Sequence, residues 1–149
     1  MRRGLRVLVC GVALAGLTLA GAGVATAQDQ PAKPVLTLDG DAAVITLLIK
    51  PDKTAEFEGV IKKLKESLAK SEKPERKQQL AGWKFFKSPA AGPQGNVVYI
   101  FAIDPVIKDQ EYDITRLIAE VFPVEVQEVF AKYKESFAGR AITSLTKVQ

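Results

Sequence analysis

Two apolar stretches joined by a turn decide the fold class: Gly82-Trp83-Lys84-Phe85-Phe86-Lys87 and Asn96-Val97-Val98-Tyr99-Ile100-Phe101-Ala102-Ile103-Asp104. Both are rich in β-branched and aromatic residues, which favour strands. The segment between them, residues 88–95, contains two prolines and two glycines and predicts a turn. The sequence therefore predicts a β-hairpin with a long, exposed loop.

Two further strands lie outside this hairpin. Residues 43–50, Ala-Val-Ile-Thr-Leu-Leu-Ile-Lys, are apolar on both alternating faces, which is typical of a buried strand. They follow a turn at residues 39–41. Residues 140–148 alternate more weakly, and we expect them to form the last strand.

A helix is predicted between the first strand and the hairpin. Asp52 is its expected N-cap, and the apolar residues that follow have helical spacing: Phe57, Val60, Ile61, Leu64 and Leu68. Because proline disrupts a helix interior, this helix should end before Pro74. Residues 71–79 are then a charged connection or a short extra turn.

A second helical region follows the hairpin. Asp113 is a suitable N-cap, and Pro123 predicts a break after Phe122. A new helix should begin there and carry an apolar stripe of Val126, Val129, Phe130, Tyr133 and Phe137. Gly139 is the expected end of this helix.

The resulting order is strand, helix, strand, strand, helix, strand. We predict an α+β fold of the ferredoxin-like βαββαβ type, a four-stranded antiparallel sheet with the helices on one face. Both faces of the sheet are apolar, because Val44, Thr46 and Leu48 alternate with Ile45, Leu47 and Ile49, and Val98 and Ile100 alternate with Val97, Tyr99 and Phe101. The helices cover only one face, and the sequence leaves open which of the two sets faces outward. An exposed apolar face of this size marks an association surface, so dimerisation through that face is expected.

This combination of element order and two-faced apolar strands resembles the dimeric α/β-barrel superfamily over residues 43–148. The superfamily includes antibiotic-biosynthesis-type monooxygenases, muconolactone-isomerase-like enzymes and haem-degrading enzymes. The resemblance implies two subunits facing each other through their sheets, and a pocket between helices and sheet. No catalytic motif of the superfamily is matched, and the histidine of its haem-degrading members is absent.

The chain begins with an export signal. Arg2, Arg3 and Arg6 precede an uncharged run that ends in Ala25-Thr26-Ala27, which predicts a signal peptide over residues 1–27. A retained membrane anchor is the alternative, and the paired arginines leave twin-arginine export open. Residues 28–42 are predicted as a flexible lead-in and residues 43–149 as the domain. The expected location is periplasmic or extracellular, with no stable membrane span after cleavage.

Composition excludes several kinds of chemistry. The chain has no histidine, and its one cysteine, Cys10, lies in the leader. Histidine- and cysteine-based catalysis, a thiolate or imidazole metal site and haem held by histidine or cysteine are therefore excluded for the mature protein, and no cofactor is expected. Without the three leader arginines, 18 basic residues face 17 acidic residues, which argues against a nucleic-acid partner.

Five side chains are candidates for binding a ligand. Trp83, Phe85, Tyr99 and Phe101 lie on adjacent predicted strands and would line an aromatic pocket for a small apolar or aromatic molecule, unless they fill the core. Arg116, near a helix start, is a candidate anion ligand. Its alternative role is a surface pair with Glu120 at helical spacing. No residue is assigned a catalytic role.

The sequence leaves three functions open. The first is an exported, cofactor-free homodimer that acts as a binding or interaction protein of the cell envelope. The second is a cofactor-independent monooxygenase- or isomerase-like enzyme acting on an aromatic small molecule, and the third is a subunit that pairs with a different envelope protein. A closed pocket lined by Trp83 and Tyr99 with a buried polar group would favour the enzyme. A filled core would favour the interaction protein.

Overall fold

A computed structural model describes residues 33–148, and the predicted signal peptide and the first residues of the lead-in lie outside this range. The described chain has an α+β fold built on one antiparallel sheet of four strands in the order β2-β3-β1-β4. The strands are β1 (Ala42–Ile49), β2 (Trp83–Ala91), β3 (Val97–Ile103) and β4 (Phe137–Leu145). The predicted strands are thus all present, and β2 and β4 form the two edges.

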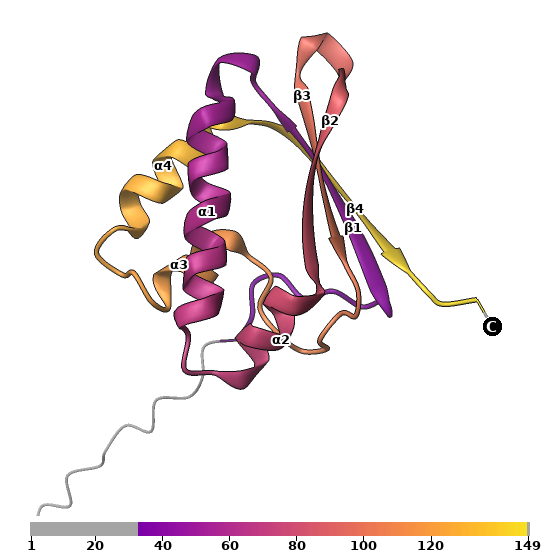
Figure 1. The fold of residues 1–149 in the computed structure, drawn as a ribbon, viewed down its shortest axis with the longest axis vertical. Coiled ribbons are helices and arrows are strands. Elements are labelled where there is room, and N and C mark those ends of the chain that lie inside the picture. The colour runs from indigo at the N-terminus through magenta and orange to yellow at the C-terminus, as the bar shows by residue number, and fades with distance from the viewer. Residues whose placement is uncertain (1–32, 149) are drawn as a thin grey trace, which may run out of the picture. The chain divides into compact units, whose positions relative to one another are not determined.

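The helices form one layer against one face of the sheet, and no helix covers the other face in the described part of the chain (Figure 1). They are α1 (Thr54–Lys70), α2 (Pro74–Gly82), α3 (Ile114–Ala119) and α4 (Val126–Ser136), with short 3₁₀ turns at Pro51–Lys53 and Pro93–Gly95. The long helix α1 packs against each of the other three helices. The expected break near Pro123 separates α3 from α4.

The strand register determines which side chains face the helices. Ile45 lies opposite Phe101 on one side and Ile142 on the other, and Phe101 in turn lies opposite Phe85. These residues belong to the inner face, which packs against the helices. The intervening residues belong to the outer face: Val44, Thr46, Leu48, Val98, Ile100, Ala102 and Phe86. The strands therefore have apolar side chains on both faces, as their sequence indicated.

The inner face and the helices enclose one core. The predicted stripe of α1 is buried throughout, with Phe57 and Leu64 fully covered and Val60, Ile61 and Leu68 nearly so. At full burial, a Leu or Phe side chain contributes about 1.5 to 3 kcal/mol. The apolar periodicity of this helix therefore predicted its packing correctly.

Three helix boundaries differ from the prediction. Asp52 does not cap α1, because Pro51 begins a 3₁₀ turn and Lys53 stands at the N-cap position without a side-chain bond. Residues 74–82 form a full helix, α2, whose first residue is Pro74, a favoured position for proline. Gly139 does not end α4. The helix ends at Ser136, because Phe137 already pairs with Ile49 in the sheet.

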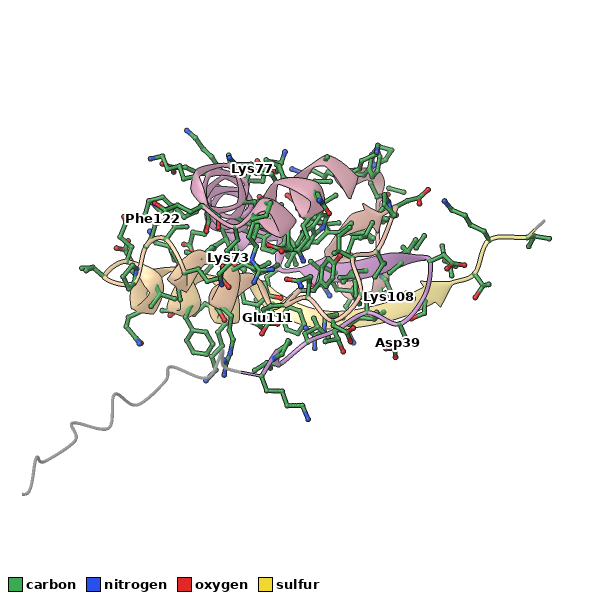
Figure 2. All side chains as sticks on the ribbon, turned by 90° about the horizontal axis from the view of Figure 1, so that it is seen from below. Asp39, Lys73, Lys77, Lys108, Glu111 and Phe122 are labelled. Carbon is green, nitrogen blue, oxygen red and sulfur yellow. The ribbon has the colours of Figure 1, made fainter. Side chains whose placement is uncertain are left out.

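The segment before β1 was predicted as a flexible lead-in, but its described residues pack against the domain. Leu38 is 3% exposed and belongs to the core, and Leu36 is half-buried against it. The Lys108 ammonium donates to the carbonyls of Asp39 and Gly40 from the loop after β3 (Figure 2). The folded unit therefore includes residues 36–41 as well as the sheet and helices.

Candidate functional site

The four aromatic candidates lie together on the inner face of the sheet. Trp83 stacks on Phe85 with 5.5 Å between ring centroids, and Phe85 meets Phe101 edge-on at 4.7 Å. Tyr99 lies one pair further along β3, where it meets the Phe57 ring of α1 edge-on at 4.9 Å. Trp83, Tyr99 and Phe101 are buried, so this group forms part of the core. The predicted hairpin neighbourhood is confirmed.

Tyr99 carries its hydroxyl to the edge of the helix layer. The hydroxyl donates to Glu58 Oε1 at 2.6 Å, and Lys87 Nζ lies 2.9 Å from the same oxygen. The Tyr99 hydrogen bond and the Lys87 charge lower the pKa of Glu58. Burial and the carboxylate of Glu58 raise the pKa of Tyr99, so its phenol stays protonated at neutral pH. Such a group holds the hairpin to α1 and is poorly suited to accept a proton from a substrate.

A small cavity lies between the sheet and α3, and Trp83 lines it together with Phe101 and Tyr112. The space open to the centre of a water-sized sphere is about 10 Å³, which is close to the minimum for one water molecule. Tyr99 is not among the lining residues. This cavity is therefore not the closed pocket lined by both Trp83 and Tyr99 that would have favoured an enzyme.

Trp83 contributes an unusual polar atom to this region. Trp83 is 4% exposed. Among the described residues, its Nε1 is the one buried side-chain nitrogen or oxygen without a hydrogen-bond partner. An indole N–H can only donate. Leaving such a donor unpaired in a protein interior costs about 1 to 3 kcal/mol. Each such group in a folded protein therefore calls for a specific explanation.

Three polar side chains also line the cavity: Asp113, Tyr133 and Arg140. Arg140 lies on β4 opposite Leu47, so its side chain leaves the inner face of the sheet. Burial raises the pKa of Tyr133, and the nearby positive charge of Arg140 opposes that rise. Asp113 is engaged as the predicted N-cap of α3, where it accepts the backbone N–H of Arg116 at 3.0 Å and the hydroxyl of Thr115.

Arg116 does not reach the aromatic group. Its side chain lines a separate open groove between α3 and α4, together with Ala119, Val126 and the half-exposed ring of Phe130. The predicted surface pair between Arg116 and Glu120 is not formed either, because Glu120 binds two residues of the α2 region instead. The structure thus separates the fifth candidate from the other four.

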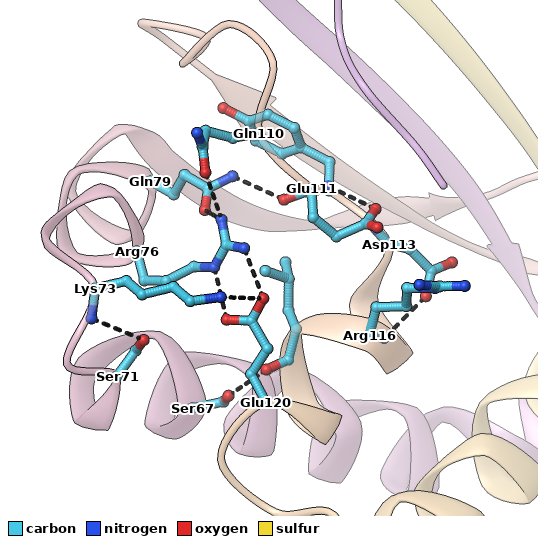
Figure 3. A network of polar contacts seen from close by, with 12 residues as sticks. Ser67, Ser71, Lys73, Arg76, Gln79, Gln110, Glu111, Asp113, Arg116 and Glu120 are labelled. Atoms are coloured by element: carbon cyan, nitrogen blue, oxygen red, sulfur yellow. Dashed lines mark hydrogen bonds and ion pairs between the residues drawn. The ribbon is translucent and has the colours of Figure 1, made fainter. Parts of the chain in front are cut away.

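The most extensive polar network was missed by sequence reasoning. Arg76 of α2 is buried and donates through Nε and Nη2 to the two carboxylate oxygens of Glu120, at 2.9 and 2.7 Å (Figure 3). Its Nη1 donates to the side-chain oxygens of Gln79 and Gln110, at 2.8 and 3.1 Å. Four of the five guanidinium N–H groups thus donate to protein acceptors, so this network is a structural tie between α2 and α3.

Glu111 forms a second tie at the same end of the molecule. Its buried carboxylate accepts four backbone N–H groups, those of Val35, Leu36, Tyr112 and Asp113, at 2.7 to 3.1 Å. The Tyr112 N–H also donates to the Leu36 carbonyl at 2.8 Å. Glu111 therefore holds the segment before β1 against the start of α3, beside the cavity that Leu36 helps to line.

The sequence carried only a weak signal for either tie. Pro74 at the start of a charged segment, followed by Arg76 and Gln79 at helical spacing, indicates a helix with one polar face. The partners of these residues lie 32 to 44 positions away, so only the tertiary structure identifies them.

Neither metal-ligand clusters nor membrane-spanning helices are found in the described range. No group of three or more His, Cys, Asp or Glu side chains there is placed to hold a metal ion. None of the helices within residues 33–148 has the length and apolar character needed to cross a membrane.

Comparison of the chain with known proteins gave no matching family model, no matching curated protein and no matching solved structure.

Proposed function

We propose that this chain is an exported binding or interaction protein of the cell envelope, with a ferredoxin-like domain that forms a homodimer through the outer face of its sheet. The observation that carries the proposal is the apolar outer face. Val44, Leu48, Val98, Ile100 and Phe86 lie on it, and Phe86 is 53% exposed. Export is supported by the sequence of the leader.

The ferredoxin-like assignment is supported by the chain path. Two strand-helix-strand halves supply the sheet, and each half places its second strand beside a strand of the other half. Helix α2 and the division of the second helix into α3 and α4 are additions to that plan. Both additions lie on the helix side of the sheet, so the outer face stays uncovered (Figure 1).

The outer face has the chemistry of an interface core. Lys84, on the edge strand β2, is the single charged residue among the outer-face residues that pair between the four described strands. Interface cores are depleted in charge and enriched in aromatic and aliphatic residues. A second copy of the chain fits such a surface, because a two-fold axis pairs one apolar face with an identical one.

The outer face is large enough to form most of a dimer interface, and neighbouring segments can supply the rest. Four strands about 4.8 Å apart, each with about eight residues of about 3.3 Å, give a footprint of about 500 Å². A stable interface of standard size covers about 800 Å² per partner. The exposed tip of the β2–β3 hairpin and the residues around Leu145, which is 41% exposed, are placed to supply the remainder.

The filled interior also favours an interaction protein over an enzyme. The space beside Trp83 accommodates about one water molecule, and the Tyr99 hydroxyl is held by Glu58. An enzyme that acts on an aromatic molecule needs a cavity of about 300 Å³ or more for its substrate.

The test is a charge placed on each face of the same strand. Light scattering coupled to size-exclusion chromatography should show a wild-type dimer at micromolar concentration. Ile100→Lys should give a folded monomer, because an unpaired charge is not buried at an interface without a large cost. Tyr99→Lys should unfold the domain instead, since Tyr99 is 2% exposed on the inner face.

Two matched variants control for general effects. Ile100→Val keeps the apolar surface and should remain a dimer. Gln127→Lys adds the same charge on the exposed side of α4 and should also remain a dimer. A wild-type monomer at micromolar concentration, or a dimer that persists in Ile100→Lys, would contradict the proposed assembly.

A further inference from the structure

We propose that the free edge of β4 binds an extended, acidic segment of a partner protein, which adds to the sheet as a fifth strand. The site is separate from the outer face of the sheet and does not depend on the dimer proposed above. Three observations support it: the unpaired backbone of β4, the contrast between the two edge strands, and the uncommitted charge of Arg140.

The first observation is the backbone of β4, an edge strand that pairs with β1 alone. Lys50 N donates to Ser136 O, so the even-numbered residues of β1 face β4, where they pair with residues 139, 141, 143 and 145. The backbone N–H and C=O groups of Arg140, Ile142 and Ser144 therefore face away from β1. No backbone hydrogen bond from another segment of the described chain reaches these three residues.

The second observation is that only one of the two edges is protected against strand addition. Edge strands are commonly blunted by lysines, prolines and bulges. β2 has all three, with Lys84, Lys87 and Pro89 and a shift of its register after Lys87. Residues 139–145 of β4 pair with β1 in consecutive positions without a shift, and they contain neither lysine nor proline. The β4 edge is therefore regular and open to a further strand.

The side chains of β4 leave this edge accessible. Residues 140, 141, 143, 144 and 145 are exposed, and Ala141 and Ser144 are too small to screen the backbone. A strand added here would lie about 4.8 Å from β4 and would continue both faces of the sheet. Its alternate side chains would lie beside Arg140 and Ile142 on the helix side, and beside Ala141 and Thr143 on the outer face.

The third observation is the charge of Arg140, the one charged residue of β4. It is exposed, and the ion pairs among residues 33–148 do not include it. Its charge acts on the neutral phenol of Tyr133, and the nearby carboxylate of Asp113 caps α3. An acidic side chain on the added strand, opposite Arg140, would match the planar donors of the guanidinium. Cross-strand pairs of opposite charge stabilise a sheet.

A partner segment fits this edge better than a second copy of the chain. Residues 137–145 contain no acidic residue, so two β4 strands paired edge to edge leave both Arg140 charges without a carboxylate. The expected segment is extended, with an acidic residue opposite Arg140 and an apolar residue opposite Ile142, two positions away. In this mode of recognition the main-chain hydrogen bonds supply affinity and the alternate side chains supply specificity.

The probe is the acetylated and amidated peptide Thr-Ile-Thr-Glu-Thr-Ile-Thr, which is symmetric about its glutamate and therefore suits either strand direction. Added to the isotopically labelled protein, it should shift the backbone amide resonances of Arg140, Ile142 and Ser144 in a saturable way, with a dissociation constant of about 1 mM. The amide protons of these residues should exchange rapidly with solvent in the free protein, and about tenfold more slowly when the peptide is bound.

Peptide and protein variants separate the contributions. The same peptide with every amide N-methylated should not bind, because its backbone donors are gone. Glutamine in place of the peptide's glutamate should weaken binding to the wild type by about tenfold, and Arg140→Gln should remove this difference. Ser144→Pro deletes an N–H that faces away from β1, so it should weaken binding while the domain stays folded. Lys84→Gln, on the opposite edge, should leave binding unchanged. Thermal unfolding checks the fold of each variant.

The proposal is overturned if the wild-type protein shows no saturable shift of these amide resonances up to about 5 mM peptide, five times the expected dissociation constant. It is also overturned if the N-methylated peptide binds as well as the unmodified one, or if the glutamate and glutamine peptides bind equally. Protection of the Ile142 and Ser144 amides that grows with protein concentration, without peptide, would assign the edge to a second copy and overturn it as well. None of these results depends on whether the outer face of the sheet dimerises.

Discussion

Arg76 and Glu120 lie 44 residues apart in the chain, yet the guanidinium of Arg76 contacts both carboxylate oxygens of Glu120, at 2.9 and 2.7 Å. Lys73 Nζ lies 3.2 Å from the second of these oxygens. The Arg76 side chain is 5% exposed and that of Glu120 is 25% exposed. The pair therefore fixes α2 to α3. Because it is partly shielded from solvent, breaking it should lower the free energy of unfolding considerably.

Removal of the Glu120 carboxylate should destabilise the domain markedly. Glu120→Ala leaves the buried Arg76 charge without its main partner, and removing one member of a buried pair costs about 3 to 5 kcal/mol. Because Glu120 is partly exposed, we expect a loss of about 2 kcal/mol, measured by urea denaturation. Glu66→Gln breaks a solvent-exposed pair with Lys70 and should change stability little. Equal losses in the two variants would contradict the assigned role.

The same pair predicts a pH dependence. Burial alone would raise the pKa of Glu120, but the hydrogen bonds and charges of Arg76 and Lys73 outweigh it and lower the pKa from its ordinary value of 4.5. A depressed folded-state pKa means that the stabilisation is complete above about pH 4.5 and is lost as the pH falls through the folded-state value.

Urea denaturation from pH 7 to about pH 3 measures this effect as the difference in unfolding free energy between the wild type and Glu120→Gln. The difference should be constant near neutrality and shrink in acid. A difference that stays constant down to pH 3, or that grows in acid, would show that Glu120 is not stabilised as its ionised form.

Two glycines provide a matched pair of opposite predictions. Gly59 lies in the middle of α1, and a Cβ atom there would meet nothing within 4 Å. Gly59→Ala should therefore stabilise the domain by about 0.5 to 1 kcal/mol, because alanine is the better helix former. Gly40 is closely surrounded, and a Cβ atom there would lie 2.5 Å from the Ala42 carbonyl oxygen and 2.6 Å from that of Leu145.

Gly40→Ala should lower the melting temperature, since backbone atoms on both sides must move to admit the methyl group. Thermal unfolding of both variants under one set of conditions checks the pair. A stabilising Gly40→Ala would contradict the close approach of the segment before β1 to the end of β4.

Export predicts a defined N-terminus. The Ala25-Thr26-Ala27 triplet predicts cleavage before Gln28, so mass spectrometry of protein recovered from the envelope should find Gln28, or a residue within one or two positions of it, as the first residue. Ala27→Arg should block processing, because the cleavage site requires small residues, whereas Thr26→Ser should not. An intact leader on wild-type protein in membranes would instead establish an anchor.

The hairpin and helix α1 show where sequence reasoning succeeds. Phe57, Leu64 and Leu68 repeat with helical spacing, and Trp83 and Phe85 alternate with Lys84 and Phe86. In each case the local period fixes which side chains share a face. These local patterns correctly predicted the α+β class, the four strands and the break between α3 and α4. They also placed Trp83, Phe85, Tyr99 and Phe101 on one face of the hairpin.

The helix boundaries and the polar networks of Arg76 and Glu111 show where sequence reasoning fails. Asp52 and Gly139 have suitable local chemistry for a cap, yet Pro51 and the pairing of Phe137 with Ile49 override them. Arg76, Glu111 and Glu120 read as ordinary surface charges in sequence. The burial of Arg76 and Glu111 and the ion pair of Glu120 depend on partners from distant segments, and no local pattern encodes such a partner.

The sequence by itself determined the apolar character of both sheet faces and the absence of histidine and of any cysteine beyond Cys10, because these depend only on composition and on a period of two. The tertiary structure alone decided that Ile100 faces outward while Tyr99 faces α1. It also alone placed Arg140, and not Arg116, beside Trp83. The reason is that both placements depend on strand register and helix packing, which are set by contacts between segments far apart in the chain.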